Sequence, residues 1–373
     1  MAAARLTAPA YAAPLGDDPV DWLRLLRSRR IGPVTFHRLV AEHGSVSEAL
    51  RILPEVARVA GVENYEACPV GVALHEMKQA QVAGAQMLRW GEANYPAGLQ
   101  ELADAPPVLW VRGDIDLLAR PMVALVGARS ASSLGLRMAR RLGESLGAAG
   151  LVVVSGLARG IDAEAHQAAI DSGTVAVQAG GVDHIYPAEN AALAAQILAK
   201  GCLVSEQPMG MEPQTRHFPI RNRIISGLAQ AVVVIEAAAR SGSLITAEAA
   251  LEQGREVFAV PGHPFDARAS GCNRLIRDGA TLIRSAKDIL EGLHFAAPVP
   301  AVDVGPEPTQ RVLKDISALH SQILSRLGPS PLAEDQLIRD LAIPAALIAP
   351  ELVTLELEGR ILRQSGGLLS RLS

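Results

Sequence analysis

Short runs rich in valine alternate with helical stretches through the middle of this 373-residue chain. The helical stretches include Leu134–Ala148 and Asp162–Ile170. Aromatic residues make up only 3% of the chain, so a core of Val, Leu, Ile and Ala is expected, which favours a parallel sheet. The pattern predicts repeated βαβ units, with helices on both faces of the sheet. The strands expected in this repeat are Met122–Val126, Leu151–Val154, Thr174–Val177, Leu203–Val204, Ala231–Ile235 and Glu256–Val260, and Val108–Val111 is expected as a separate strand before it, at a domain boundary.

Loops that contain Gly or Ser follow several of these strands and precede helices. Ligands of such sheets gather beyond the carboxyl ends of the strands. Gly allows close backbone approach, Ser supplies a hydroxyl, and helix amides attract anions, so these loops are typical of phosphate sites. Arg129 and Arg159 lie within two of them. The loops are Gly127–Ser132, Ser155–Gly160, Gly180–Gly181 and Ser241–Ser243.

The segment Thr215–Leu228 concentrates arginine beside one aromatic side chain, Phe218. Guanidinium groups bind phosphate in a bidentate fork, and an aromatic face stacks on a base. Pro219 is predicted to open a helix and to place Arg221 and Arg223 in its first turn. Cations are disfavoured there by the helix dipole, and a bound anion would relieve that cost. The segment therefore favours a nucleic-acid strand as ligand, whereas a solvated basic turn is the plainer alternative.

Several familiar chemistries are not indicated. The loop at Gly127 lacks the dinucleotide pattern Gly-x-Gly-x-x-Gly, and the chain has no Gly-Lys-Ser/Thr phosphate loop. Three dispersed cysteines predict neither a disulfide framework nor a zinc site, so no cofactor or metal is expected. His166 lies four residues after Asp162, a spacing that suits an acid/base pair but more often gives a local hydrogen bond that fixes the helix.

These motifs resemble the DNA-processing protein A family, also called Smf. The resemblance extends from Tyr95 to about Leu290. It implies an extended Rossmann-like domain that binds single-stranded DNA and helps load the RecA recombinase in natural transformation, as a homodimer and without an established enzymatic activity. The motifs that carry it are Val126–Ser132, Ser155–His166, Phe218–Leu228, Glu236 with Ser241–Ala247, and Pro261–Gly262.

By this resemblance, Arg129, Phe218, Arg221 and Arg223 match DNA-contacting positions, and Gly242 lies in a matching loop. The family's first loop usually reads Gly-Ser-Arg, whereas this chain has Ala128 in the middle position. The change removes one hydroxyl and keeps the arginine. Together with the loop chemistry, the candidate nucleic-acid contacts are Arg129, Ser130, Ser132, Gly156, Arg159, Arg216, His217, Phe218, Arg221, Asn222, Arg223, Ser241, Gly242 and Ser243.

The flanking regions predict further domains. We expect a loose tail at 1–15, a small helical domain at 16–92, the Rossmann-like domain at 93–295, a Pro-rich linker at 296–309 and a winged helix at 310–373. The turn between the first two expected helices, at Ile31–Pro33, lies near Arg27, Arg29, Arg30 and Arg38. A solvated face is favoured for these arginines over a phosphate site. In the winged helix, the segment Pro344–Glu358 carries glutamate and no Arg, Lys, Asn or Gln, which favours a protein contact over DNA reading.

Two other functions remain open at this point. A phosphoribohydrolase-like enzyme acting on nucleotides would use Glu206 or Glu236, but the Pro-Gly-Gly-x-Gly-Thr loop of those enzymes is missing. A structural adaptor would bind through the winged helix alone. The net charge of −4 requires any DNA binding to come from a local basic patch. The absence of a long apolar run and the few cysteines favour a cytoplasmic protein without a membrane span.

Overall fold

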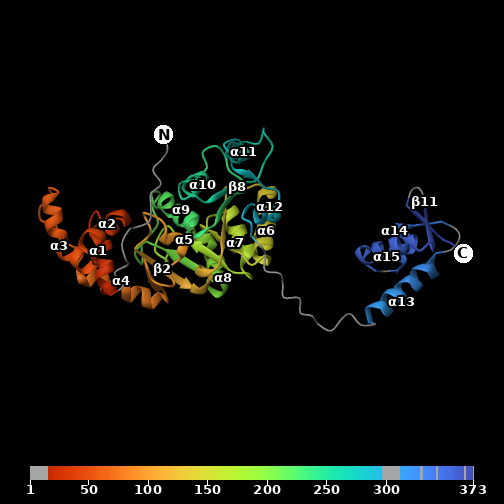
Figure 1. Ribbon diagram of the computed structural model, residues 1–373, viewed down its shortest axis with the longest axis horizontal. Coiled ribbons are helices and arrows are strands. Elements are labelled where there is room, and N and C mark those ends of the chain that lie inside the picture. The colour runs from red at the N-terminus through yellow and green to blue at the C-terminus, as the bar shows by residue number, and fades with distance from the viewer. Residues whose placement is uncertain (1–15, 296–310, 328–330, 342, 365–366, 373) are drawn as a thin grey trace. The chain divides into compact units, whose positions relative to one another are not determined.

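The computed structural model describes all residues except 1–15, 296–310, 328–330, 342, 365–366 and 373. The chain forms two compact units, Met1–Pro298 and Val299–Ser373 (Figure 1). The predicted tail at 1–15 and the predicted linker at 296–309 lie outside the described residues.

A nine-stranded sheet forms the centre of the larger unit, in the order β1-β2-β6-β5-β4-β3-β7-β8-β9. The strands from β6 to β9 in that order are parallel, while β1 and β2 pair antiparallel at one edge. The predicted parallel sheet is therefore confirmed. The strands are β1 Gln86–Arg89, β2 Val108–Gly113, β3 Met122–Val126, β4 Val152–Ser155, β5 Thr174–Val177, β6 Cys202–Ser205, β7 Ala231–Val234, β8 Glu256–Ala259 and β9 Thr281–Leu282.

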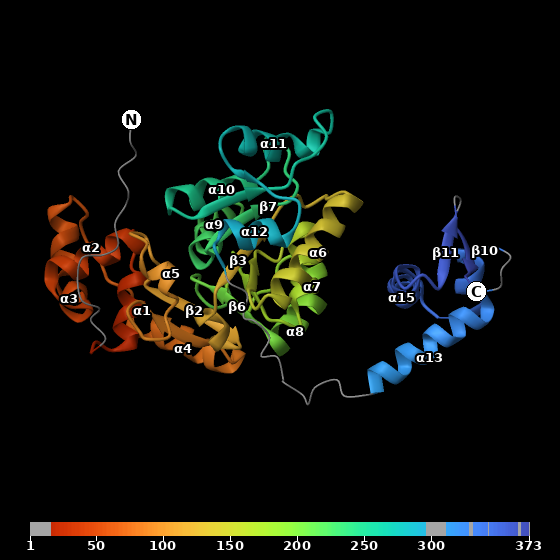
Figure 2. The same ribbon diagram turned by 45° about the vertical axis from the view of Figure 1, so that its right-hand side comes forward.

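Helices cover both faces of this sheet (Figure 2). Along β3, Met122 and Ala124 join one apolar core, whereas Val123 and Leu125 join the other, because successive side chains of a strand point to opposite faces. Both faces are thus buried, which explains the continuous apolar runs in the sequence. The helices are α5 Ala97–Gln100, η1 Ile115–Ala119, α6 Ser133–Ala148, α7 Ile161–Ala169, η2 Ala188–Asn190, α8 Ala191–Lys200, α9 His217–Leu228, α10 Ser243–Glu252, η3 Ala267–Ala269, α11 Ser270–Arg277 and α12 Ala286–Gly292.

The chain reverses direction within the sheet beside β3. From β3 it proceeds through β4 and β5 to β6, and it then returns to β7 on the other side of β3. This arrangement is a topological switch point, where the loops after two adjacent strands leave in opposite directions and open a crevice. The loops after β3 and β7 are therefore the expected place for a ligand.

Helices α1 Pro19–Arg27, α2 Pro33–His43, α3 Val46–Val59 and α4 Val70–Ala83 form the predicted N-terminal helical part. Their apolar side chains belong to the same buried cluster as one face of the sheet. Glu76 on α4 joins them to it: the carboxylate accepts hydrogen bonds from Arg27 at 2.8 Å and from the Trp110 indole at 2.8 Å. Arg27 is thereby engaged, and Arg38 pairs with Glu42 at 3.2 Å on an exposed face.

The smaller unit has the predicted winged-helix arrangement. Its apolar core contains Ile323, Leu337, Leu352 and Leu369. The third helix, α15, pairs its glutamates within the unit, since Glu351 contacts His320 at 2.6 Å and Glu356 contacts Arg363 at 3.2 Å. The elements are α13 Arg311–Arg326, β10 Leu332–Ala333, α14 Glu334–Leu341, α15 Ala345–Leu357, β11 Ile361–Gln364 and β12 Leu368–Arg371.

The helix that carries the arginine segment begins earlier than predicted. Helix α9 starts at His217, so Pro219 is its third residue and Arg221 and Arg223 lie beyond the first turn. The expectation that the helix dipole favours an anion at these two arginines was therefore wrong, since the dipole acts within the first turn.

Two kinds of feature are absent from the described residues. None of the helices in this part of the chain is both long and apolar enough to span a membrane. Within the same residues, no three His, Cys, Asp or Glu side chains lie close enough together to hold a metal ion.

Candidate nucleic-acid interface

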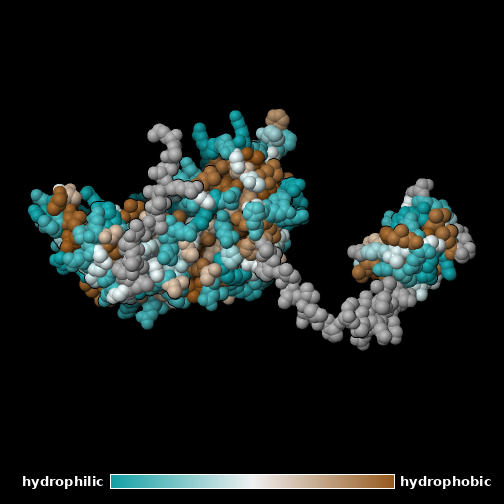
Figure 3. All heavy atoms as spheres, in the orientation of Figure 1, coloured by the Kyte–Doolittle hydropathy of each residue, from teal (hydrophilic) through white to brown (hydrophobic). Residues whose placement is uncertain are grey.

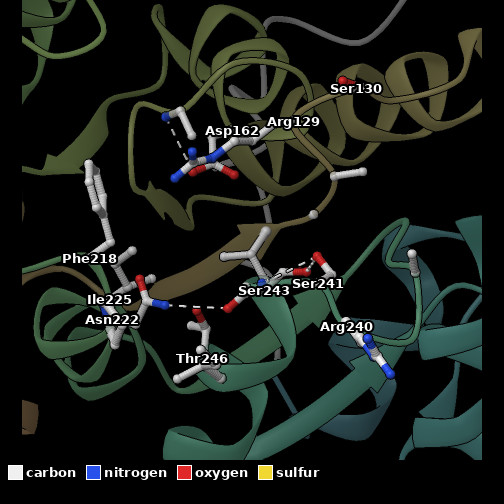
Figure 4. A pocket seen from close by; sticks show the side chains of 18 of the residues that line it. Arg129, Ser130, Asp162, Phe218, Asn222, Ile225, Arg240, Ser241, Ser243 and Thr246 are labelled. Carbon is white, nitrogen blue, oxygen red and sulfur yellow. Dashed lines mark hydrogen bonds between the residues drawn. The ribbon is translucent and has the colours of Figure 1, made fainter. Parts of the chain in front are cut away.

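A groove of about 630 Å³ opens at the switch point of the sheet. Figure 4 shows Arg129 and Asp162 on one side of it, Ser243 and Thr246 on the other, and Phe218 with Asn222 at one end. The walls come from the loops after β3, β4 and β7 and from the start of α9. The lining residues are Val126, Gly127, Ala128, Arg129, Ser130, Ala158, Asp162, Phe218, Pro219, Arg221, Asn222, Ile225, Ala238, Arg240, Ser241, Gly242, Ser243, Ile245, Thr246 and Arg268.

Arg129 and Phe218 meet at one end of the groove. The Arg129 guanidinium carbon lies 5.3 Å from the centre of the Phe218 ring, within the range of a cation–π contact. On its other flank, Phe218 contacts the exposed ring of Tyr186, with ring centres 5.6 Å apart. A second hollow of about 330 Å³ lies beside this pair and is lined by Tyr186, Pro187, Phe218 and both Arg129 and Arg159. Aromatic faces and guanidinium groups are thus combined in one place.

The loop after β7 supplies the opposite wall. The Ser241 and Ser243 hydroxyls are 2.8 Å apart, and the Asn222 amide donates to the Gly242 carbonyl at 3.5 Å. A Cβ atom built on Gly242 would meet no atom within 4 Å, so this glycine borders open space. The predicted serine loop therefore does face the groove, at the start of α10.

Arg221 lines the groove but is buried, with 6% of its surface exposed. Its Nη1 donates to the Val177 carbonyl at 2.6 Å. Burial lowers the pKa of Arg221 to about 10, opposed by the charge of Asp162, and it remains protonated at neutral pH. Burial likewise raises the pKa of Asp162, which accepts hydrogen bonds from the Gly156 and Ala158 amides. Arg221 thus braces the groove floor, instead of projecting freely as the sequence suggested.

Arg223 lies on a different side of α9 and does not line the groove. It forms ion pairs with Glu206 at 2.5 Å and with Asp104 at 3.3 Å, and only 12% of its side chain is exposed. Burial raises the pKa of Glu206, and the Arg223 charge opposes that rise. Arg223 is therefore neutralised by carboxylates, contrary to the expectation that it faces a phosphate beside Arg221.

Ser132 is hydrogen-bonded to Glu236 and does not project freely into the groove. It is the N-cap of α6, where its hydroxyl accepts from the Gly135 amide at 3.0 Å and donates to Glu236. The Ser132 amide also donates to Glu236 at 2.9 Å. The Ser132 hydroxyl and both Glu236 oxygens are occupied, whereas the neighbouring Ser130 is exposed on the groove.

Glycines in two of the predicted loops have no room for a Cβ atom, because neighbouring protein atoms lie against them. A Cβ on Gly156 would lie 2.0 Å from Nη1 of Arg221, so this glycine makes room for the buried guanidinium. The space beside Gly180 and Gly181 is also occupied, here by backbone atoms. A Cβ on Gly180 would lie 2.5 Å from the Met211 carbonyl, and one on Gly181 would lie 2.6 Å from the Pro208 carbonyl. The expectation that all four loops border a ligand was wrong for Gly180–Gly181.

The remaining predicted residues are not part of the main groove lining. Arg159 is exposed and pairs with Glu189 at 3.1 Å. Arg216 is exposed immediately before α9, and its Nε lies 3.3 Å from the ring of His217. His217 is buried; Nδ1 accepts from the Gln214 amide, and burial lowers the pKa of the imidazole. Of these three, the arginines are accessible and the histidine shapes the turn.

His166 and Asp162 do not hydrogen-bond to each other. Nδ1 of His166 lies 2.7 Å from the Thr174 hydroxyl, and burial lowers the pKa of the imidazole to about 3. Asp162 instead fixes the loop after β4 through the backbone amides described above. The helix is anchored by two separate contacts, so an acid/base pair is not assembled here.

Three groove or rim residues were missed by sequence reasoning. Arg240 is exposed and lies at the end of the groove away from Phe218 (Figure 4). Its position directly before Ser241 was an available signal. Arg268 comes from the loop before α11, and Tyr186 precedes η2, and neither position had a local signal that related it to this site. Among the described residues, Arg129 and Arg240 have no ion-pair partner.

Comparison with known proteins gives the same assignment for three parts of the chain. Residues 86–294 match the model of "DNA recombination-mediator protein A". Residues 16–79 match the "DprA-like N-terminal HHH domain", and residues 306–367 match the "DprA winged helix domain". The three matches follow the order of the helical part, the sheet and the winged helix.

Individual relatives agree with these matches. DNA processing protein DprA of Bacillus subtilis is 48% identical over 53% of this chain and 68% of its own, and protein Smf of Escherichia coli is 40% identical over 73% and 74%. The X-ray structure of DNA processing protein A from Streptococcus pneumoniae covers 73% of this chain and 97% of its own, with 37% identity and a TM-score of 0.63. A Helicobacter pylori DNA processing protein A structure covers 56% and 95%, with 28% identity and a TM-score of 0.52. The chain therefore belongs to the DNA processing protein A (DprA/Smf) family.

Proposed function

We propose that this chain binds single-stranded DNA in the groove beside β3 and β7. The observation that carries the proposal is the combination of Arg129, Arg240 and Arg268 with the aromatic pair Tyr186 and Phe218 in one open site. Arginines along a groove attract a phosphate backbone, and aromatic rings stack on unpaired bases without selecting a sequence. The Helicobacter pylori relative, whose structure gives insight into its single-stranded DNA binding mode, supports the same ligand.

Within this proposal the candidate residues have two kinds of role. Direct contacts come from side chains and backbone that are accessible on the groove or its rim. Arg221, Arg223, Ser132, Gly156 and His217 hold those contacts in place through their internal partners. The proposed direct contacts are Arg129, Ser130, Arg159, Arg216, Phe218, Asn222, Ser241 and Gly242, with Arg240 and Arg268 added, while the buried Ser243 supports Ser241 through the contact between their hydroxyls.

We further infer that the bound strand is passed to a RecA recombinase, as a cytoplasmic homodimer of this chain. The support is the family name for residues 86–294, which designates a recombination mediator, and the resemblance of the sequence motifs. The two carboxylates considered for catalysis are engaged elsewhere, which agrees with a binding role for the groove. Glu236 is engaged by Ser132, Glu206 is paired with Arg223, and neither lines the groove.

The test of the ligand is direct competition between DNA forms. A fluorescent oligothymidylate bound to the full chain is displaced by unlabelled single strands and by a duplex of the same length at one salt concentration. We expect single strands to compete at least about tenfold better, because stacking on Tyr186 and Phe218 requires unpaired bases. Equal competition by duplex would contradict the proposed ligand.

Phe218→Ala is expected to reduce single-strand affinity by about 1 to 3 kcal/mol through lost stacking.

Arg129→Ala is expected to flatten the salt dependence of binding by about 0.7 in the slope of log affinity against log salt, the single-strand value for one phosphate contact. Since the guanidinium lies over the ring, the double variant should deviate from additivity by about 0.5 to 1 kcal/mol. Titrations of the wild type, both single variants and the double variant measure this, and strict additivity would contradict a functional Arg129–Phe218 contact.

Removal of the winged helix is expected to leave most single-strand affinity in place. The glutamates of α15 are paired internally, while Leu347, Val353 and Leu357 on the same helix are exposed, a surface suited to protein. Figure 3 shows brown, apolar side chains on the surface of this unit. The affinity of residues 1–300 is compared with that of the full chain at fixed salt. A loss greater than about tenfold, or roughly 1.4 kcal/mol, would identify the winged helix as a principal DNA site.

A further inference from the structure

We propose that Phe265, with His263, forms a second base-stacking site on the DNA path, outside the groove and beyond Arg268. This inference rests on the proposed function and extends it to the loop that follows the Pro261–Gly262 motif. Phe265 is 94% exposed, the highest value among the large apolar side chains described as exposed. A single exposed apolar side chain is common on protein surfaces, but a phenylalanine ring beside a second ring and a groove-lining arginine offers a face for base stacking.

The loop that presents Phe265 is anchored at both ends. Gly262 and Asn273 exchange two hydrogen bonds of 3.1 and 3.0 Å, which close the base of the loop. Asp266 caps η3 by accepting from the Arg268 amide at 3.0 Å, and its own amide donates to the His263 carbonyl at 2.9 Å. Figure 2 shows the segment beside α11 standing out from the body of the larger unit. The ring is thus held outward by a defined turn.

A second ring accompanies Phe265. The centres of the His263 and Phe265 rings lie 5.6 Å apart at an angle of 39°, and the Phe265 amide lies 3.3 Å from Nδ1 of His263. Both side chains are exposed. Two adjacent aromatic faces are the arrangement on which unpaired bases stack regardless of their identity. An apolar protein partner would need further exposed apolar side chains around Phe265. The neighbours in the loop are Pro264 and the charged Asp266, which do not extend an apolar surface.

Arg268 belongs both to the groove lining and to the turn that carries Phe265. It pairs with Asp266 at 3.1 Å, which fixes the guanidinium beside the loop while leaving 53% of the side chain exposed. The start of α11 is joined to the segment after β7, because the Gly271 amide donates to the Ala237 carbonyl at 2.8 Å. The proposed path of the strand runs from the groove past Arg268 to His263 and Phe265.

The experiment uses the full chain and oligothymidylates of about 6 and about 16 nucleotides, a range that spans typical single-strand site sizes. Phe265→Ala should weaken binding of the long oligonucleotide by about fivefold or more and leave the short one unchanged, because the short one is held by the groove alone. Phe265→Trp should retain long-strand affinity, and its fluorescence should be quenched on binding. Phe265→Leu should behave like Phe265→Ala, since leucine is apolar but offers no aromatic face. As a reference, Phe218→Ala should weaken both lengths.

Several results would overturn the second site while leaving the proposed function intact. Long-strand affinity unchanged in Phe265→Ala, or fully retained in Phe265→Leu, would exclude stacking. Equal losses for both lengths would place Phe265 within the groove site. A change in the mass of the assembly by light scattering, with unchanged DNA affinity, would assign the ring to a protein contact. Failure of the wild type to bind either oligonucleotide would instead contradict the proposed function.

Discussion

Arg221→Glu is expected to lower the free energy of unfolding of the larger unit by about 3 to 5 kcal/mol, the cost of leaving a buried charge uncompensated. The substitution removes the hydrogen bond to the Val177 carbonyl and places a second carboxylate near the buried Asp162. If Arg221 were an exposed phosphate contact, its substitution would reduce DNA affinity and leave the free energy of unfolding almost unchanged. Urea unfolding of the variant, followed by circular dichroism, measures the difference, and DNA binding is expected to fall as the groove floor is lost.

Two further variants test the same site independently. Gly156→Ala should also destabilise the unit, because the new methyl group would lie 2.0 Å from Nη1 of Arg221. Gly242→Ala is its matched control, since a Cβ there meets nothing within 4 Å. Unchanged stability in Arg221→Glu, together with lost DNA affinity, would show that Arg221 acts as a phosphate ligand and that the structural account is wrong.

The double variant Arg129→Glu/Arg240→Glu is expected to reduce single-strand affinity by at least about 100-fold. Each arginine is exposed at the groove, and each charge-assisted hydrogen bond to phosphate contributes about 1.5 to 3 kcal/mol. The two losses together amount to about 3 to 6 kcal/mol, and the new carboxylates add repulsion. Because both side chains are on the surface, thermal stability should change little. Fluorescence anisotropy with one oligothymidylate at fixed salt measures the loss.

The matched control carries the same change in net charge elsewhere. Arg51 and Arg58 on α3 are exposed and pair only with Glu48 and Glu55 of the same helix in the hydrogen bonds described. Arg51→Glu/Arg58→Glu should therefore retain affinity within about threefold, as expected for charges outside the contact. Comparable losses in the two double variants would indicate that overall charge, and not the groove, governs binding.

The central sheet and the winged helix were predictable because their signals are local. Valine runs such as Val152–Val154 stay apolar on both faces, which indicates a strand covered on both sides. The hairpin at the end of the chain is marked by Gly367 between two short segments that begin with apolar residues. These patterns need only neighbouring residues for their interpretation. The edge strand β1 had no such signal, since Gln86–Arg89 is short and partly polar and is defined by pairing with β2.

The direction of the arginines on α9 was not predicted, although the reason is simple. Positions two apart on a helix point to different sides, so Arg221 and Arg223 cannot serve the same phosphate surface. The sequence does not show that Asp162 and Val177 lie on one side of α9, near Arg221. It also does not show that Glu206 and Asp104 lie on the other side, near Arg223. Those partners come from four different parts of the chain. Burial of a charge depends on tertiary contacts, and composition alone gives no measure of it.

The glycines were misjudged for a related reason. A glycine in a strand-to-helix loop indicates that something approaches the backbone closely, but it does not identify what approaches. At Gly156 the neighbour is Arg221, and at Gly180 it is the Met211 carbonyl. Only the folded structure separates these positions from Gly242, which borders open space.

Wild-type affinity for single-stranded DNA across a salt series tests the central claim most directly. If the three groove arginines Arg129, Arg240 and Arg268 each neutralise one phosphate, the plot of log affinity against log salt should fall with a slope of about −2 or steeper, at about −0.7 for each contact. The same titration with duplex of equal length should show weaker binding at every salt concentration. A slope near zero, or duplex bound as tightly as single strands, would contradict the proposal that this groove holds a single DNA strand by its phosphates.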